Sequence, residues 1–168
     1  MGILNVTPDS FSDGGQFIDV DAAVEHALAM ARGGADIIDV GGESTRPGAE
    51  SVSVDEELRR VVPVIERLAE AVDVLISIDT AKPAVARAAL AAGAAIVNVI
   101  TGLHGDEALA RVAAEFGAAL VVMHIKGTPR TMQQNPVYDD LLGEVIAYLR
   151  ESIAIAERNG VPAERVIV

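Results

Sequence analysis

The chain has 168 residues, of which 51% are hydrophobic, so it is long and apolar enough to fold around a sizeable core as a single domain. Its formal net charge of −12 repels nucleic acids and anionic membrane surfaces, and we expect neither as a partner. The sequence has no Cys, which excludes disulfides and thiolate metal sites. It shows neither a secretory signal nor an apolar run long enough to cross a bilayer, which predicts a cytoplasmic protein.

Strands and helices are predicted to alternate along the chain. Short runs rich in Val, Ile and Leu predict six strands, at residues 3–6, 37–40, 74–78, 95–99, 119–123 and 166–168. Amphipathic or Ala-rich segments that mostly end at glycine predict five intervening helices, at residues 21–32, 53–69, 83–92, 106–116 and 139–158. Strict alternation of this kind predicts a parallel sheet with right-handed crossovers.

Two of these helices carry more specific signals. Ser53 and Glu56 have the spacing of an N-terminal capping box, and Pro63 predicts a kink or an early first turn in the same helix. In the last helix, apolar residues that recur at helical spacing predict its buried side. They are Leu142, Val145, Ile146, Leu149 and Ile153.

Two architectures fit the alternation, a doubly wound open sheet and a (β/α)8 TIM barrel. Neither G-x-G-x-x-G nor G-x-x-x-x-G-K-[ST] occurs, so a Rossmann or P-loop nucleotide site is not supported. Every complete connection from a strand to a helix begins with polar residues, and the carboxyl ends of barrel strands converge on one mouth. We therefore predict an α/β fold of the (β/α)8 barrel type. The barrel is incomplete here, with about six strands and five helices, because a full one needs roughly 250 residues.

The polar residues at the strand ends are candidates for ligand binding. Asp79 closes a very apolar strand, where a carboxylate serves either as a helix cap or as a bidentate acceptor for adjacent N–H donors, such as those of an aminopyrimidine. Asn98 lies in a strand of Ala, Ile and Val and needs hydrogen-bond partners, and Asn5 occupies a similar position on the first strand. Three such strand ends in one chain favour a shared site. His124 has no second His at ligand spacing, which favours a structural or stacking role.

Residues 36–48 read D-I-I-D-V-G-G-E-S-T-R-P-G and place a polar loop directly after a buried strand. In that loop, Thr45 and Arg46 can hold an anion or a substrate carboxylate. The cations available to an anionic ligand are Arg46, Lys82, Lys126 and Arg130. Loop acids that could bind magnesium through oxygen are Asp9, Asp13 and Glu43.

Four strings in this chain resemble the dihydropteroate synthase family. The two long ones match its signature segments, G-I-L-N-V-T-P-D-S-F-S-D-G-G at residues 2–15 and G-G-E-S-T-R-P-G at residues 41–48. Two shorter strings also resemble it, S-I-D-T-A-K-P at residues 77–83 and the stretch 123–133, which contains M-H and T-M-Q. The similarity extends from one end of the chain to the other.

The resemblance implies a barrel enzyme of folate biosynthesis that condenses 4-aminobenzoate with a dihydropterin diphosphate and releases pyrophosphate. It implies that Asp79 and Asn98 hydrogen-bond the pterin, that Met123 packs against the pterin ring, and that Asn5 helps to bind Mg²⁺ and the pyrophosphate. No residue is assigned as a catalytic acid or base. Two loops would cover the phosphate side and the aminobenzoate, the region that sulfonamides occupy in this family. Their candidate residues are Thr7, Asp9, Phe11, Ser12, Ser44, Thr45, Arg46 and Pro47.

The chain also departs from the family pattern. The family commonly has Asp directly after the Asn that matches Asn98, whereas this chain has Val99, which predicts altered hydrogen bonding near the pterin. The family's Asp-Pro-Gly turn and its later Lys and Arg-x-His do not occur in residues 1–168. We therefore expect one pterin-binding barrel domain that stops before strands 7 and 8, is inactive by itself, and belongs to a homodimeric protein.

Two other functions remain as alternatives to the synthase. One is the pterin-binding barrel of a corrinoid methyltransferase, which shares the Asp and Asn strand ends but has no need of S-T-R-P-G. The other is a homologue that binds pterin without catalysing a reaction. Methyl transfer from a methylated folate to cobalamin would support the methyltransferase. Tight pterin binding without turnover would support the non-catalytic homologue.

Overall fold

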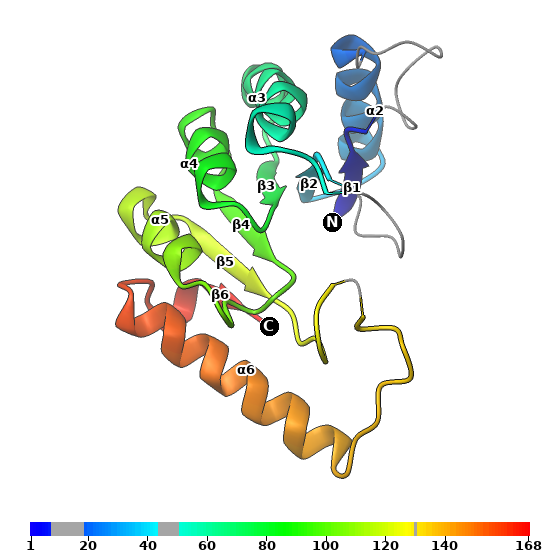
Figure 1. Cartoon of the computed structure of the whole chain (residues 1–168). Helices are drawn as coiled ribbons and strands as arrows, with labels where there is room; N and C mark the ends of the chain where they lie inside the picture. The colour runs from blue at the N-terminus through cyan, green and yellow to red at the C-terminus, as the bar shows by residue number, and fades with distance from the viewer. Residues whose placement is uncertain (8–18, 44–50, 130) are drawn as a thin grey trace.

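The computed structural model describes residues 1–7, 19–43, 51–129 and 131–168, and these form one parallel six-stranded sheet (Figure 1). Its strands are β1 (Gly2–Asn5), β2 (Ile37–Gly41), β3 (Leu75–Asp79), β4 (Ile96–Val99), β5 (Ala119–Val122) and β6 (Val166–Ile167). Each strand pairs with its predecessor in the sequence, so the order runs from β1 to β6 without a reversal. A doubly wound sheet reverses its order at a switch point. The observed order therefore excludes that architecture and confirms the predicted, incomplete barrel.

The helices lie along one side of the sheet (Figure 1). They are α2 (Val20–Arg32), α3 (Val54–Ala71), α4 (Pro83–Ala91), α5 (Ala108–Phe116), α6 (Leu141–Arg158) and a short 3-10 helix, η1 (Ala163–Arg165). Successive helices from α2 to α6 are in contact with one another. This arrangement places the helices on the outside of the barrel arc and leaves the opposite face of the sheet toward the barrel interior.

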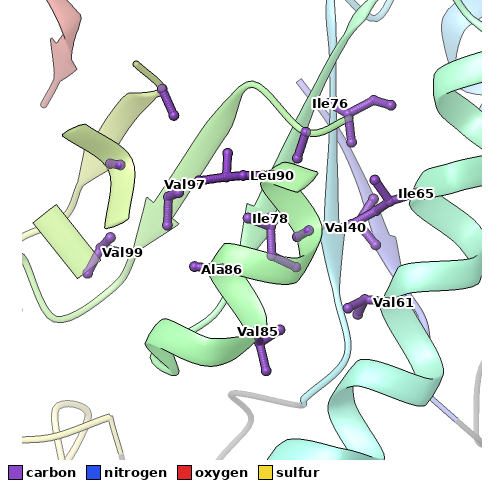
Figure 2. Packing of buried hydrophobic residues seen from close by; sticks show 14 of the residues in the cluster. Val40, Val61, Ile65, Ile76, Ile78, Val85, Ala86, Leu90, Val97 and Val99 are labelled. Atoms are coloured by element: carbon purple, nitrogen blue, oxygen red, sulfur yellow. The ribbon is translucent and has the colours of Figure 1, made fainter. Parts of the chain in front are cut away.

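Alternate residues of each strand form the core between the sheet and the helices. Because side chains alternate along a strand, one set faces the helices and the other set faces the barrel interior. The helix-facing set is buried in one apolar cluster with residues of the helices, and Figure 2 shows its members from β2, β3 and β4 beside α3 and α4. It comprises Leu4, Ile38, Val40, Ile76, Ile78, Val97, Val99, Leu120 and Val122. On the interior face, Ile3 is 65% and Leu75 53% exposed.

In helix α3 the predicted N-terminal cap is confirmed, whereas the early first turn predicted at Pro63 is not observed. Ser53 is the N-cap, and its side chain accepts a hydrogen bond of 3.2 Å from the backbone N–H of Glu56, as the capping-box spacing predicts. Pro63 lies well inside α3, which continues through it to Ala71. The predicted early first turn at Pro63 is therefore wrong, because the cap at Ser53 starts the helix earlier.

Helix α6 buries its predicted side only in part: Leu149 packs against the core as predicted, whereas the N-terminal end of that side is exposed. Its buried residues are Ser152, Ile155 and Ala156, near its C-terminal end, where it packs against α5. Leu142 and Ile146, which the helical spacing assigns to the buried side, are 72% and 47% exposed because the N-terminal half extends away from α5 (Figure 1). In the described parts of the chain, no helix is both long enough and apolar enough to span a membrane.

Candidate functional site

One row of paired residues crosses the carboxyl edge of the sheet and carries polar side chains. Asn5 pairs with Gly41, Gly41 with Asp79, and Asp79 with Asn98. Each of these residues neighbours a helix-facing core residue, so their side chains belong to the interior face. A Cβ placed on Gly41 would lie 3.8 Å from Oδ2 of Asp79 and 3.9 Å from Oδ1 of Asn5. The structure thus brings Asn5, Asp79 and Asn98 to one edge, with the side-chain-free Gly41 between the first two.

A second carboxylate, Asp39, lies on the same face, two residues before Gly41 on β2. Its side chain is 5% exposed, and its Oδ2 accepts a 2.9 Å hydrogen bond from Nδ2 of Asn98. Within the described ranges its Oδ1 has no hydrogen-bond partner, and neither does Oγ of Ser77, its register partner on β3. The sequence analysis did not select Asp39 as a site residue. The signal was a charged residue inside the apolar run Ile37–Val40, at the spacing that shares a face with Gly41.

Two effects together raise the pKa of Asp79 to about 7. The larger is burial, because the ionised form loses water that would stabilise it, and the other is the negative charge of Asp39, Glu57 and Glu43. Among the described residues, no cation forms an ion pair with Asp79 to offset these effects. A ligand that offers N–H donors to both carboxylate oxygens would therefore favour the ionised form of Asp79.

On the helix side of the same strand ends, the charged groups are paired. Glu57 of α3 is fully buried, and it accepts hydrogen bonds from Thr80 Oγ1 at 2.7 Å and from Lys82 Nζ at 2.5 Å. Lys82 also forms an ion pair with Glu43. Burial alone would lower the pKa of Lys82, but the hydrogen bonds to Glu43 and Glu57 raise it above its ordinary value. We call these four residues, Glu43, Glu57, Thr80 and Lys82, the paired network.

The paired network corrects the prediction about available cations. Lys82 is held by Glu43 and Glu57, and Lys126 pairs with Glu144 at 2.6 Å while its Nζ lies 4.2 Å from the ring centroid of Tyr138. Neither lysine is therefore free for an anionic ligand, because each already neutralises carboxylates. The other two predicted cations, Arg46 and Arg130, lie outside the described residues.

Met123 and His124 follow strand β5 and lie in different surroundings. Met123 follows Val122 and belongs to the same face as Val121, the register partner of Asn98, and it is 37% exposed. His124 makes an edge contact with the ring of Tyr148, with ring centroids 4.9 Å apart, which agrees with the predicted stacking role. Met123 is therefore placed next to the polar row, whereas His124 contacts α6.

Val99 does not alter the polar row. Its side chain is fully buried in the core on the helix-facing side of β4, among the residues labelled in Figure 2. Asn98 is on the opposite face, because neighbouring residues of a strand alternate. The structure therefore does not support the expectation that Val99 changes hydrogen bonding beside Asn98.

The family to which this fold and site belong follows from comparison with known proteins. The family model described as pterin binding enzyme matches residues 1–168. The chain belongs to the pterin binding enzyme family. Its relatives include the dihydropteroate synthase of Escherichia coli K12, which is 52% identical over 168 residues, 100% of this chain and 59% of the E. coli protein. A probable bifunctional folylpolyglutamate synthase/dihydropteroate synthase of Haloferax volcanii is 55% identical, over 100% of this chain and 20% of that protein.

Solved structures from the same family have the same fold. The Xanthomonas albilineans dihydropteroate synthase with 4-aminobenzoic acid matches with a TM-score of 0.87 and 49% identity, over 99% of this chain and 58% of that one. The Yersinia pestis dihydropteroate synthase in a sulfonamide drug complex matches with a TM-score of 0.89 and 46% identity, over 99% of this chain and 60% of that one. The resemblance to dihydropteroate synthases is thus confirmed, and the chain spans well under two thirds of these relatives.

Most of the loop residues expected to cover the substrates lie outside the described part of this pterin binding enzyme. Thr7 is described and lies two residues after Asn5, the last residue of β1 and the first of the polar row. The others are Asp9, Phe11, Ser12, Ser44, Thr45, Arg46 and Pro47, together with the candidate acid Asp13. Their roles stay predictions.

The chemistry of Asn5 fits the predicted magnesium site. Mg²⁺ prefers oxygen ligands and commonly takes only one or two from the protein, the rest coming from water and substrate phosphates. Asn5 is exposed, and its amide oxygen faces the space above Gly41. Glu43, the other described candidate, is engaged by Lys82. In the described ranges, no three His, Asp or Glu side chains gather as a metal cluster.

Proposed function

We propose that the whole protein is a dihydropteroate synthase, which joins 4-aminobenzoate to a dihydropterin diphosphate. In this reaction the aromatic amine nitrogen attacks the exocyclic methylene carbon of the pterin. A C–N bond forms, the C–O bond to the diphosphate breaks, pyrophosphate leaves with the electron pair, and the amine loses a proton. The observation that carries the proposal is the row of Asn5, Gly41, Asp79 and Asn98 at the barrel mouth. It occurs in a chain that is 52% identical to the E. coli enzyme of that name.

The pterin end of the substrate would bind at Asp79 and Asn98. The aminopyrimidine ring of a pterin carries adjacent N–H donors, whose spacing matches the two oxygens of a carboxylate. Asp79 is largely buried and has no cation beside it in the described part of the chain, so such donors would supply the stabilisation that its ionised form lacks. Met123, beside the row, would pack against the face of the ring.

The diphosphate end would lie toward Asn5, across Gly41 from Asp79. Asn5 would contribute its amide oxygen to a magnesium ion, and the bound ion would neutralise charge on the departing pyrophosphate. The loop residues Thr7, Asp9, Phe11, Ser12 and Ser44 to Pro47 would cover the aminobenzoate and the phosphates. No side chain is needed as a strong base, because the reaction depends on a held electrophile and a stabilised leaving group.

The decisive experiment supplies the full-length protein with both substrates and magnesium and measures pyrophosphate release together with dihydropteroate formation. We expect both products only when both substrates are present. Absence of pyrophosphate release would contradict the proposal. Methyl transfer from a methylated folate to cobalamin would instead support the methyltransferase alternative, and tight pterin binding without turnover would support a non-catalytic homologue.

A variant at Gly41 tests whether the polar row is the site. An added Cβ at Gly41 would meet Asp79 Cβ at 3.7 Å and Asn5 Oδ1 at 3.9 Å, which are ordinary contact distances, so Gly41→Ala should fold normally. The methyl group would nevertheless fill the space between the two polar side chains. We expect a thermal unfolding midpoint close to that of the wild type but a loss of synthase activity of about tenfold or more. Wild-type activity in this variant would remove the row from the site.

We further propose that the protein acts in the cytoplasm as a homodimer. Its substrates are small soluble molecules, and the sequence has no Cys that would indicate an oxidising compartment. The dimer rests on the resemblance to the dihydropteroate synthase family. Sedimentation of the purified protein tests it, and a monomer at micromolar concentration would contradict it.

A further inference from the structure

Asp39 has no role in the function proposed above, yet it touches a residue that does. Its Oδ2 accepts a hydrogen bond from Asn98 Nδ2 at 2.9 Å, across the strand β3 that separates the two residues. The Asp39 side chain is 5% exposed, and among the described side chains only Asn98 donates a hydrogen bond to it. A carboxylate buried with so few partners lowers stability, so its position calls for another explanation.

The chemistry of this contact determines how the Asn98 amide is oriented. An amide has a donating NH₂ end and an accepting carbonyl end, and the two look alike in shape. An ionised carboxylate can only accept hydrogen bonds. The NH₂ end of Asn98 must therefore face Asp39, and the carbonyl oxygen is left for a ligand. With Asn at position 39, either end of the Asn98 amide would find a partner.

We propose that Asp39 is a positioning residue, which holds the Asn98 amide in one orientation with its carbonyl oxygen available to the ligand. The site then selects a ligand edge that donates hydrogen bonds. The nature of that ligand rests on the proposed function. Asp79 presents two further acceptor oxygens next to Asn98 in the row. An edge with amino and N–H groups would then meet acceptors at both residues, whereas an edge with carbonyl groups would meet repulsion at both.

The orientation can be tested without any ligand. The side-chain amide signals of Asn98 are identified by their loss in Asn98→Ala and then followed by NMR in the wild-type protein, in Asp39→Asn and in Ser77→Ala. In the wild type we expect one Nδ2 proton that is shifted downfield and protected from exchange with water. Asp39→Asn should lose both properties, because the amide can rotate. Ser77→Ala should keep them, because Ser77 Oγ makes no hydrogen bond. Unchanged Asn98 signals in Asp39→Asn would overturn the proposal.

The selectivity is tested with two probes that differ in one group. 6-Hydroxymethylpterin has an amino group at ring position 2, and 6-hydroxymethyllumazine has a carbonyl oxygen there. We expect the wild type to prefer the pterin, and Asp39→Asn to reduce the ratio of the two Kd values by about tenfold, the size of one hydrogen bond to a charged or oriented partner. Ser77→Ala, the matched neighbour on β3, should leave the ratio unchanged.

A double variant separates positioning from a structural role. Asp39→Asn combined with Asn98→Asp exchanges the two partners, restores a hydrogen bond between them and puts an acceptor-only group at position 98. We expect the pterin preference to return. A merely structural role for Asp39 predicts instead that both Kd values rise together in Asp39→Asn with the same ratio, and that result would overturn the inference. If the wild type binds neither probe, the proposed function fails, and the ligand-free NMR comparison still decides the orientation.

Discussion

Two groups of buried acids lie at the carboxyl ends of β2 and β3, one on each face of the sheet. On the helix side, Glu57 is fully buried and receives hydrogen bonds from both Thr80 and Lys82. On the interior side, Asp39 and Asp79 have no cation among the described residues, Asp39 leaves one oxygen unpaired, and the pKa of Asp79 rises to about 7. The same kind of side chain is thus neutralised on one face and left unsatisfied on the other.

The difference separates what holds the strand ends in place from what is left for a ligand. A buried charge that has lost its water must find partners or lower the stability of the fold. The paired network meets that requirement within the protein. The interior pair does not, and such exceptions concentrate at functional sites. Four experiments test this contrast.

The largest effect is expected from pH and Asp79. The pKa of its carboxyl is 3.8 in the unfolded reference and about 7 in the folded protein, so between these values the folded state keeps a proton that the unfolded chain has released. The contribution of Asp79 to stability should therefore be greatest below this window and fall as pH rises through it, by about 4 kcal/mol at most. Urea unfolding of the ligand-free protein at pH 5 and pH 8 measures the fall. Asp79→Asn should lack it, and an identical pH dependence in both proteins would contradict the assignment.

Breaking the paired network should lower the free energy of unfolding by slightly less than the Asp79 effect. Lys82→Met leaves Glu57 buried without its cation, and we expect the free energy of unfolding to drop by about 3 kcal/mol. Adding Glu57→Gln should recover part of the loss, because the uncompensated charge is gone. The matched surface control is Arg87→Gln, whose pair with Glu115 is about half exposed and should matter little. Equal losses in Lys82→Met and Arg87→Gln would erase the distinction between the paired network and an ordinary surface pair.

The third effect concerns ligand binding alone. Asp79→Asn keeps the shape of the side chain but removes the charge and one acceptor, so pterin affinity should fall by about 2 kcal/mol. Calorimetric titration with 6-hydroxymethylpterin measures it, and the unfolding experiment above shows whether the variant is folded. Unchanged affinity would remove Asp79 from the site.

The smallest effect compares two buried serines. Ser77 Oγ has no hydrogen-bond partner, so Ser77→Ala should raise the free energy of unfolding by about 1 kcal/mol. Ser152 is equally buried, but its Oγ donates to the Tyr148 carbonyl oxygen at 3.0 Å and lies 3.2 Å from His104 Nε2, so Ser152→Ala should lower it by a similar amount. Changes of the same sign in the two variants would contradict this account.

The sequence predicts the barrel and the polar row well because both depend on local signals. Runs of β-branched residues and glycines mark the strands and the ends of the helices, and a polar residue at each strand end places Asn5, Asp79 and Asn98 at one edge. Strict alternation then predicts neighbouring parallel strands. The strand order from β1 to β6 agrees with this reasoning.

The sequence does not predict which side chains from different strands and helices come into contact. Asp39 and Asn98 are 59 residues apart, and their contact depends on register and on a strand between them. Glu57 follows Asp55 and Glu56 in an acidic first helical turn, and nothing in that string marks it as the one that is fully buried. Lys82 was predicted to be free for the same reason, because its two partners lie on other elements.

Strand β4 also offers a practical opportunity to protein engineers. Val97 and Val99 point into the hydrophobic core shared with the helices, and Asn98 between them is on the opposite face, where it donates a hydrogen bond to Asp39. A mutant library confined to the two valines would sample thermostability while leaving the polar row unchanged. Selecting for altered specificity would require the complementary library, built on the residues in between.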